Sequence, residues 1–200
     1  ILAANRDGLI VLSGCLAIDI PELIVRDQLK QARQTIDWFK QTLGADNFYL
    51  ELQDNGAEGQ GLVNREMVRL ARAEGLPLVA TNDCHYLTQA DAHPHDCLIC
   101  IGTGKTVSEK NRLKYPGDQF YFKSADEMRT VFGEVEEALR NTVEIAERCN
   151  LEIPMGAHHL PTYQVPPGTT RDEYLTDLAR RGLEDRLRQR RPHAPPDQYW

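Results

Sequence analysis

The sequence lacks any long apolar run. No stretch approaches the roughly 18–20 apolar residues that a membrane-spanning helix needs, which argues against a membrane protein. The chain also opens without an initiating Met, and residues 1–6 lack the basic segment and apolar core of a secretory signal. We therefore expect the sequence to begin inside a longer protein that is not exported.

Positive charge and cysteine are also limited. Lys and Arg number 23 against 30 Asp and Glu, and the net charge of −7 argues against nonspecific nucleic-acid binding by the chain as a whole. The cysteines number five, an odd count without an export signal, which indicates free thiols in a reducing cytoplasm. What is present is a globular composition, with 41% hydrophobic and 26% charged residues.

The first hundred residues alternate between strand and helix patterns. Short apolar runs predict strands at 8–13, 48–52 and 76–81, and apolar residues at steps of three and four predict helices at 25–43 and 63–71. A glycine follows each helix as a stop signal. This βαβαβ order predicts parallel strands joined by right-handed crossovers, and thus an α/β fold.

The second half is mainly helical. A helix is expected at 90–101, followed by a loop at 102–117. Ser124 and Glu127 form the Ser-x-x-Glu pattern of a capping box, and further helical periodicity runs from 135 to about 150.

A linker then separates a last helix from the preceding residues. Residues 151–168 hold four prolines, which makes this stretch the best linker candidate. Thr170 and Glu173 form a second capping box, opening a helix that continues to about 187. The tail at 190–196 is expected to be a turn or connector. We place the domain boundary at 150, dividing the chain into 1–150 and 151–200.

Candidate ligands for a metal ion fall at or near the ends of the three expected strands. Cys15 follows the first, Glu51 lies late in the second, and Asp83 and His85 follow the third. Sites in parallel α/β folds form at these carboxyl ends, and residues two apart in an extended segment point the same way. A thiolate, an imidazole and a carboxylate suit zinc, and carboxylate-rich sites also take manganese. Taken singly, each residue also fits an ordinary structural role, such as a buried Cys or a solvent-facing Glu.

Other motifs have simpler interpretations. Cys97-x-x-Cys100 lacks a second pair and lies in an apolar helical run, so structural burial is expected. His93 and His95 suit surface or capping roles. Lys105 lacks the spacing of a phosphate-binding loop. A basic stretch near the end of the chain is expected to be a solvated helix face or a contact for DNA or a partner protein. Its arginines are Arg180, Arg181, Arg186, Arg188, Arg190 and Arg191.

Several stretches together resemble one family, the bacterial DNA polymerase III α subunits. They cover nearly the whole chain and are specific only in combination. They are Leu12-Ser13-Gly14-Cys15, Phe48-Tyr49-Leu50-Glu51-Leu52-Gln53, the run from Leu78 to Tyr86, the run from Ile99 to Thr106, Phe120-Tyr121-Phe122-Lys123-Ser124 with Glu127-Met128, and Asn141-Thr142 with Ile145 to Asn150.

The resemblance implies a polymerase and histidinol phosphatase (PHP) domain, which is a distorted (β/α)7 barrel with metal ligands at its strand ends. Residues 1–150 would be the later part of this barrel, and 151–200 would be a linker and helical segment entering the polymerase palm. A ligand role carries over to Cys15, Asp83 and His85, while Glu51 receives no firm assignment. Asn55 stands where many relatives have His. The family's first His-x-His ligands would precede Ile1, and the magnesium-binding carboxylates for nucleotide addition would lie after Trp200, so no polymerase catalytic residue is expected within this chain.

The resemblance also implies a function. The parent protein would be a DNA-directed DNA polymerase acting on primer-template DNA and deoxynucleotides, with the sliding clamp and a proofreading or other holoenzyme subunit as partners. The PHP site would hold zinc or manganese and is a candidate 3′–5′ exonuclease. Two alternatives stay open. The PHP domain is a non-catalytic scaffold that stabilises the polymerase and binds a proofreading subunit, or the chain is a free-standing PHP phosphoesterase.

Overall fold

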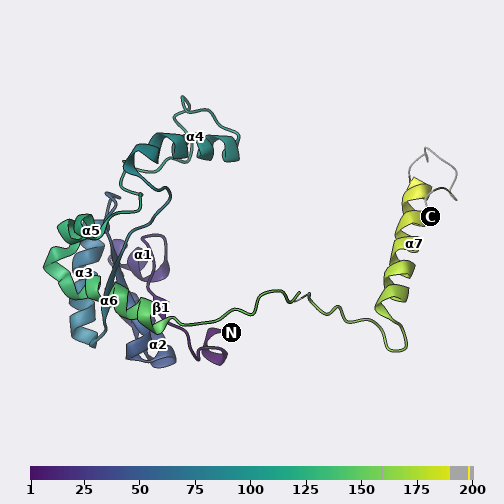
Figure 1. Cartoon of the computed structure of the whole chain (residues 1–200), viewed down its shortest axis with the longest axis horizontal. Helices are drawn as coiled ribbons and strands as arrows, with labels where there is room; N and C mark the ends of the chain where they lie inside the picture. Colours follow the sequence, from purple (N-terminus) through teal and green to yellow (C-terminus); the bar gives the residue numbers. More distant parts are fainter. Residues whose placement is uncertain (159, 190–197, 199–200) are drawn as a thin grey trace. The chain divides into compact units, whose positions relative to one another are not determined.

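The computed structural model describes residues 1–158, 160–189 and 198. It forms two compact units, Ile1–Leu151 and Glu152–Trp200. Figure 1 labels the helices α1 to α7 and the strand β1 along the chain. The strands are β1 (Val11–Leu12), β2 (Phe48–Gln53) and β3 (Leu78–Thr81), and the helices are α1 (Asp19–Val25), α2 (Leu29–Leu43), α3 (Gln60–Glu74), α4 (Ala92–Thr103), α5 (Ala125–Phe132), α6 (Glu136–Arg148) and α7 (Arg171–Gln189). Short 3-10 turns are η1 (Leu2–Ala4), η2 (Ala45–Asn47), η3 (Gln89–Asp91) and η4 (Gly133–Val135).

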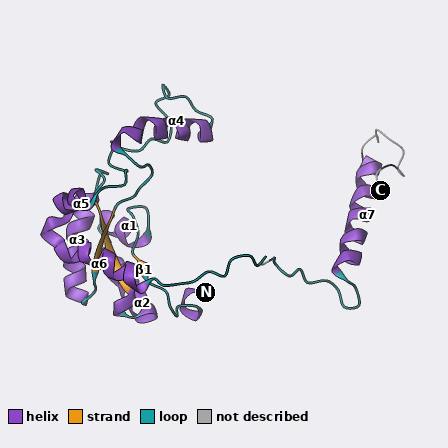
Figure 2. Cartoon of the chain, in the orientation of Figure 1, coloured by secondary structure: helices purple, strands orange, loops and turns teal. Residues whose placement is uncertain are grey.

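The first unit is built on a small parallel sheet in the order β1-β2-β3. Leu50 pairs with Leu78, and the register continues to Gln53 opposite Thr81. β2 is the central strand and is almost wholly buried, as a strand covered on both faces must be. Figure 2 shows the strands lying among the surrounding helices, and α3 contacts β2 while α6 contacts β3. The parallel α/β class predicted from the sequence is confirmed, whereas the described residues show three strands and no closed barrel.

Apolar side chains of the helices form the core against this sheet. Ile36 in α2 and Met67 and Leu70 in α3 are completely buried, together with Phe48 and Leu50 of β2. These residues lie on the helical faces that the periodicity predicts. Their burial removes apolar surface from water and fixes the sheet between its helices.

The helix expected at 25–43 is wrong at its start. The structure has two helices there, because Val25 ends α1 and α2 begins only at Leu29. Asp27 between them has φ 57°, and its N–H donates to the carbonyl oxygen of Ile24. Asp enters this left-handed region more readily than most residues, so the chain turns here although the apolar spacing continues. The stop at Gly44 is confirmed.

Both capping boxes are confirmed by their hydrogen bonds. The hydroxyl of Ser124 accepts from the N–H of Glu127, and the Glu127 carboxylate accepts from the N–H of Ser124. Thr170 and Glu173 make the same reciprocal pair at the start of α7. Each pair satisfies backbone donors that a helix start leaves open.

The second unit contains α7, preceded by a stretch from 152 in which the described residues form no helix or strand. The predicted tail at 190–196, with Arg190 and Arg191, lies outside the described residues. Arg180, Arg181, Arg186 and Arg188 lie on α7, where Arg181 and Arg188 pair with acidic side chains of the same helix. Within 1–158 and 160–189, no helix combines the length and the apolar character needed to cross a membrane.

Candidate metal centre

The carboxyl ends of the three strands meet at one edge of the sheet. Cys15 follows the end of β1, Asn55 follows β2 and Asp83 follows β3. All three line one cavity of about 260 Å³, which we call the strand-end cavity. Its other walls come from the loop after β1, from the segment between the end of β2 and the start of α3, and from the loop that ends at Phe120. These residues are Leu16, Ala17, Gln53, Ala57, Gln60, Leu113, Lys114, Tyr115, Pro116 and Phe120.

Asp83 and His85 lie side by side. His85 Nε2 is 3.1 Å from Asp83 Oδ1, as expected of residues two apart in an extended segment. The backbone N–H of His85 donates to the carbonyl oxygen of Phe120 at 2.7 Å, which fixes this segment against the neighbouring chain. The His85 ring contacts the rings of Tyr115 and Phe120, both of which line the strand-end cavity. His85 itself thus lies beside the cavity, next to Asp83.

Cys84, between these two residues, points elsewhere. Its thiol donates to the carbonyl oxygen of Tyr121 at 3.6 Å. Burial raises the pKa of the Cys84 thiol, and burial also lowers the pKa of the nearby Lys123 ammonium. The alternation of an extended segment therefore separates Cys84 from the Asp83 and His85 pair.

Glu51 ties the three strands together. Its Oε2 accepts from the N–H of Gly14, and its Oε1 accepts from the hydroxyl of Thr81 and from Gln53 Nε2. These bonds join the loop after β1 to the end of β3 across the central strand. Three of the roughly four acceptor positions of the carboxylate are thereby occupied, which favours a positioning role for Glu51.

Asn55 also lines the strand-end cavity, although no role was predicted for it. Its side chain is buried, with 3% exposed, and its Oδ1 has no hydrogen-bond partner in the structure. The loop that carries it is fixed by Gln60, whose Oε1 accepts from the N–H groups of Asn55 and Ala57. The signal in the sequence was its position just past the end of a buried strand.

The donor chemistry of this edge fits a divalent metal ion. Cys15 and Asp83 border one cavity, His85 is paired with Asp83, and the Asn55 oxygen is a buried acceptor without a donor. A thiolate, an imidazole and oxygen donors together suit zinc or manganese. The described residues nevertheless contain no group of three or more His, Cys, Asp or Glu side chains close enough to hold an ion. The ligand roles of Cys15, Asp83, His85 and Glu51 therefore stay predictions.

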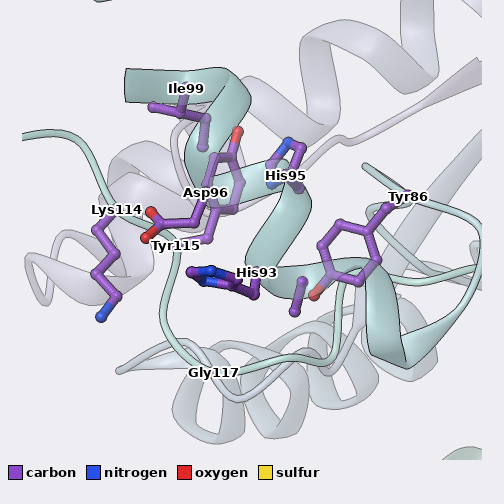
Figure 3. Close-up of a pocket in the computed structure, with 9 residues that line it drawn as sticks. Tyr86, His93, His95, Asp96, Ile99, Lys114, Tyr115 and Gly117 are labelled. Atoms are coloured by element: carbon purple, nitrogen blue, oxygen red, sulfur yellow. The ribbon is translucent and has the colours of Figure 1, made fainter. Parts of the chain in front are cut away.

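A second cavity, of about 200 Å³, lies between α4 and the loop after it (Figure 3). His93, His95 and Asp96 of α4 line it together with Lys114 and Tyr115, which also border the strand-end cavity. The His95 ring contacts those of His85, Tyr86 and Tyr115. His95 thus belongs to an aromatic cluster that reaches the candidate metal residues, beyond the surface or capping role expected from the sequence.

Arg112 holds the loop of this second cavity in place. Its two terminal nitrogens donate to the two oxygens of Asp96 at 2.6 and 2.7 Å, and the Arg112 side chain is 3% exposed. The hydrogen bond from Arg112 lowers the pKa of Asp96. This bidentate pair ties the loop to α4.

The remaining sequence motifs have structural roles. Cys100 is buried and Cys97 is partly buried, and all five cysteines are free thiols. His93 Nε2 lies 3.9 Å from the Cys97 sulfur on the same face of α4. Lys105 pairs with Glu109 at 3.3 Å.

The sequence is similar to a known protein family, and part of the match covers the loops that line the strand-end cavity. The family model of the PHP domain matches residues 1–55, a stretch that contains Cys15, Glu51 and Asn55. The DNA polymerase III subunit alpha of Treponema pallidum (strain Nichols) is 41% identical over 187 residues, or 93% of this chain. That of Borreliella burgdorferi is 44% identical over 94% of the chain, and that of Thermus aquaticus is 38% identical over 92%.

Nearly the whole chain matches DNA polymerase III alpha subunits. The resemblance found in the sequence motifs is thereby confirmed. The match covers only one segment of these proteins, because the chain spans about 16% of the length of the Treponema and Borreliella subunits and 15% of the Thermus subunit. The similarity extends well past residue 55, where the PHP domain match ends.

Proposed function

We propose that this chain is part of the replicative DNA polymerase III α subunit of a bacterium. The similarity to three such subunits over more than nine-tenths of the chain carries this proposal. The parent protein would extend DNA primers on a template by joining deoxynucleotides in the bacterial cytoplasm, with magnesium ions held by residues outside this chain. A sliding clamp and a proofreading or other holoenzyme subunit would be its partners.

Within that protein, residues 1–150 would form the later part of the PHP domain and 151–200 would lead towards the palm. The three parallel strands would be consecutive strands of its distorted (β/α)7 barrel. In support, the order β1-β2-β3 follows the chain, as it does in a barrel built from successive βα units. A free-standing PHP phosphoesterase finds no support, since the matched relatives are named as polymerase subunits.

We further propose that Cys15, Asp83 and His85 bind zinc or manganese. The shared cavity of Cys15 and Asp83, with His85 paired to Asp83, supports this set. A bound divalent ion would activate water and neutralise charge on phosphate oxygens, the chemistry of a 3′–5′ exonuclease. The chain's own contribution would be to fix the donors, with Glu51 holding the loop before Cys15 and the Phe120 carbonyl holding His85.

A second candidate function is a scaffold in which metal stabilises the fold without turnover. It is favoured by the hydrogen bonds of Glu51, because this carboxylate holds the loop after β1 and the end of β3 together instead of facing a substrate. The two functions differ in what loss of metal does. A nuclease would lose exonuclease activity, whereas a scaffold would lose only thermal stability.

The test is metal analysis of the full-length protein and of a variant carrying Cys15→Ser, Asp83→Asn and His85→Gln. We expect the variant to contain fewer equivalents of zinc or manganese. Exonuclease assays on the same two proteins, with the polymerase carboxylates intact, then distinguish nuclease from scaffold. Equal metal content in both proteins would disprove the site.

A further inference from the structure

Asn55 carries an unusual feature for a buried polar side chain. Only two buried side-chain nitrogen or oxygen atoms in the described residues lack a hydrogen-bond partner, Asn55 Oδ1 and Arg112 Nε. The other nitrogens of Arg112 are bonded to Asp96 and to backbone carbonyls, so its guanidinium is largely satisfied. An acceptor buried without a donor is costly, because it has given up its bond to water. Such an atom in a native fold calls for a ligand that satisfies it.

The fold holds Asn55 at the middle of the candidate metal centre. β2 lies between β1 and β3, so the loop after β2 lies between the loops that carry Cys15 and Asp83. All three residues line the strand-end cavity. The backbone of Asn55 is fixed by Gln60, which is itself 4% exposed at the start of α3. The backbone that carries the amide is therefore fixed before any ligand arrives, which preorganises the position of this side chain at the cavity.

We propose that the side-chain oxygen of Asn55 is a ligand for a divalent cation in the strand-end cavity, alongside Asp83. This inference rests on the proposed function, because it adds a donor to the same site. An amide oxygen and a carboxylate oxygen are hard donors, which suit manganese and magnesium better than zinc. Cys15 offers a soft sulfur donor, which favours zinc. The oxygen of Asn55 would therefore shift the preference of the site from zinc towards manganese.

The chemistry of the amide agrees with this role. An Asn carbonyl oxygen carries two lone pairs and accepts a cation without gaining or losing a proton. Turning the amide about its Cβ–Cγ bond exchanges the oxygen and the nitrogen, so the oxygen can face the cavity while the backbone stays fixed. Coordination would supply the partner that the oxygen lacks.

The experiment replaces Asn55 by Leu in the full-length protein, with Asp54→Ala as the matched control. Leu has the branched shape of Asn, with two somewhat bulkier methyl groups in place of the oxygen and the nitrogen, and so offers no donor to a cation. Asp54 is the neighbouring carboxylate, is exposed, and lines a different cavity. Mn²⁺ binding is measured by equilibrium dialysis. The signal is the Mn²⁺ that the wild type binds and the triple variant of Cys15, Asp83 and His85 does not, which excludes ions bound elsewhere in the protein.

We expect Asn55→Leu to weaken this Mn²⁺ binding at least about tenfold, the scale of effect that losing a supporting group has on metal sites. Zn²⁺ binding should fall less, and Asp54→Ala should bind Mn²⁺ as the wild type does. Without metal, the Tm of Asn55→Leu should stay close to that of the wild type, because the removal of a buried acceptor without a partner offsets the greater bulk of Leu. Added Mn²⁺ should raise the Tm of the wild type but not that of the variant.

Wild-type Mn²⁺ affinity in a folded Asn55→Leu protein would overturn the inference. If that variant does not fold, Asn55→Asp decides the matter, because it keeps the oxygen and adds a charge. It should bind Mn²⁺ at least as tightly as the wild type, and weaker binding would refute the role. Unchanged Mn²⁺ binding in the triple variant would instead refute the proposed function, so the two failures can be told apart.

Discussion

Glu51→Ala should loosen the edge of the sheet that carries the candidate metal residues. The carboxylate accepts hydrogen bonds from Gly14, Gln53 and Thr81, which belong to the loop after β1, to β2 and to β3. Hydrogen bonds to charged groups contribute about 1.5–3 kcal/mol each. Because Glu51 is partly exposed and water would replace part of these bonds, we expect a total loss of about 2–4 kcal/mol in the free energy of unfolding.

The assay is urea unfolding followed by circular dichroism, with Glu58→Ala as the control. Glu58 is an exposed acidic residue in the loop after β2, and its replacement should change the free energy of unfolding by less than about 0.5 kcal/mol. Glu51→Gln should fall between the wild type and Glu51→Ala, because its amide keeps one acceptor oxygen and loses the other. A Glu51→Ala protein as stable as the control would refute the positioning role.

The same variants separate positioning from metal ligation. If Glu51 only positions the loop before Cys15, metal affinity should fall in step with stability, and Glu51→Gln should be intermediate in both. If Glu51 is itself a ligand, Glu51→Gln should lose metal as completely as Asp83→Asn does while losing less stability. Metal titration of these three variants beside the wild type distinguishes the two outcomes.

Three further predictions concern single residues. Hydrogen bonds from Tyr121 and from the capping Ser124 lower the pKa of Glu127 from 4.5 to about 2. The ionised carboxylate should therefore stabilise the fold fully above pH 4.5, and this stabilisation should be lost as the pH falls towards 2. The free energies of unfolding of the wild type and Glu127→Gln should converge over that pH range, and a constant difference between them would contradict this. Gly14→Ala should lower the free energy of unfolding by about 1–3 kcal/mol, because Gly14 has φ 79° and the new Cβ would lie 2.5 Å from a side-chain atom of Ile18. An unchanged midpoint of urea unfolding would contradict this. Cys149 should react with a thiol reagent faster than Cys84, whose pKa is raised by burial, and the reverse order in single-Cys variants would show that reasoning to be wrong.

Local chemistry made much of the fold predictable. The apolar run at 48–52 became the central strand because all its residues can be buried, and Gly44 and Gly75 end helices because they adopt positive φ angles. Capping boxes such as that of Ser124 depend on neighbours three residues apart, so they can be seen in the sequence. The turn at Asp27 escaped prediction because the apolar periodicity runs through it.

The site was less predictable because its bonds join residues far apart in the chain. The proximity of Asp83 and His85 follows from their spacing. The bonds from Gly14 and Thr81 to Glu51 do not, since they exist only once three strands are aligned. The unpartnered oxygen of Asn55 likewise appears only when every neighbour is in place.

The proposed metal centre requires that a Cys15 thiolate bind a divalent ion at the strand-end cavity. The most direct measurement is the absorption spectrum of the Co²⁺-loaded full-length protein, in which a bond from thiolate sulfur to Co²⁺ gives a charge-transfer band in the near ultraviolet. The band should be present in the wild type and in Cys84→Ser, and absent in Cys15→Ser. A band of equal strength in Cys15→Ser, or no band in the wild type, would contradict the account.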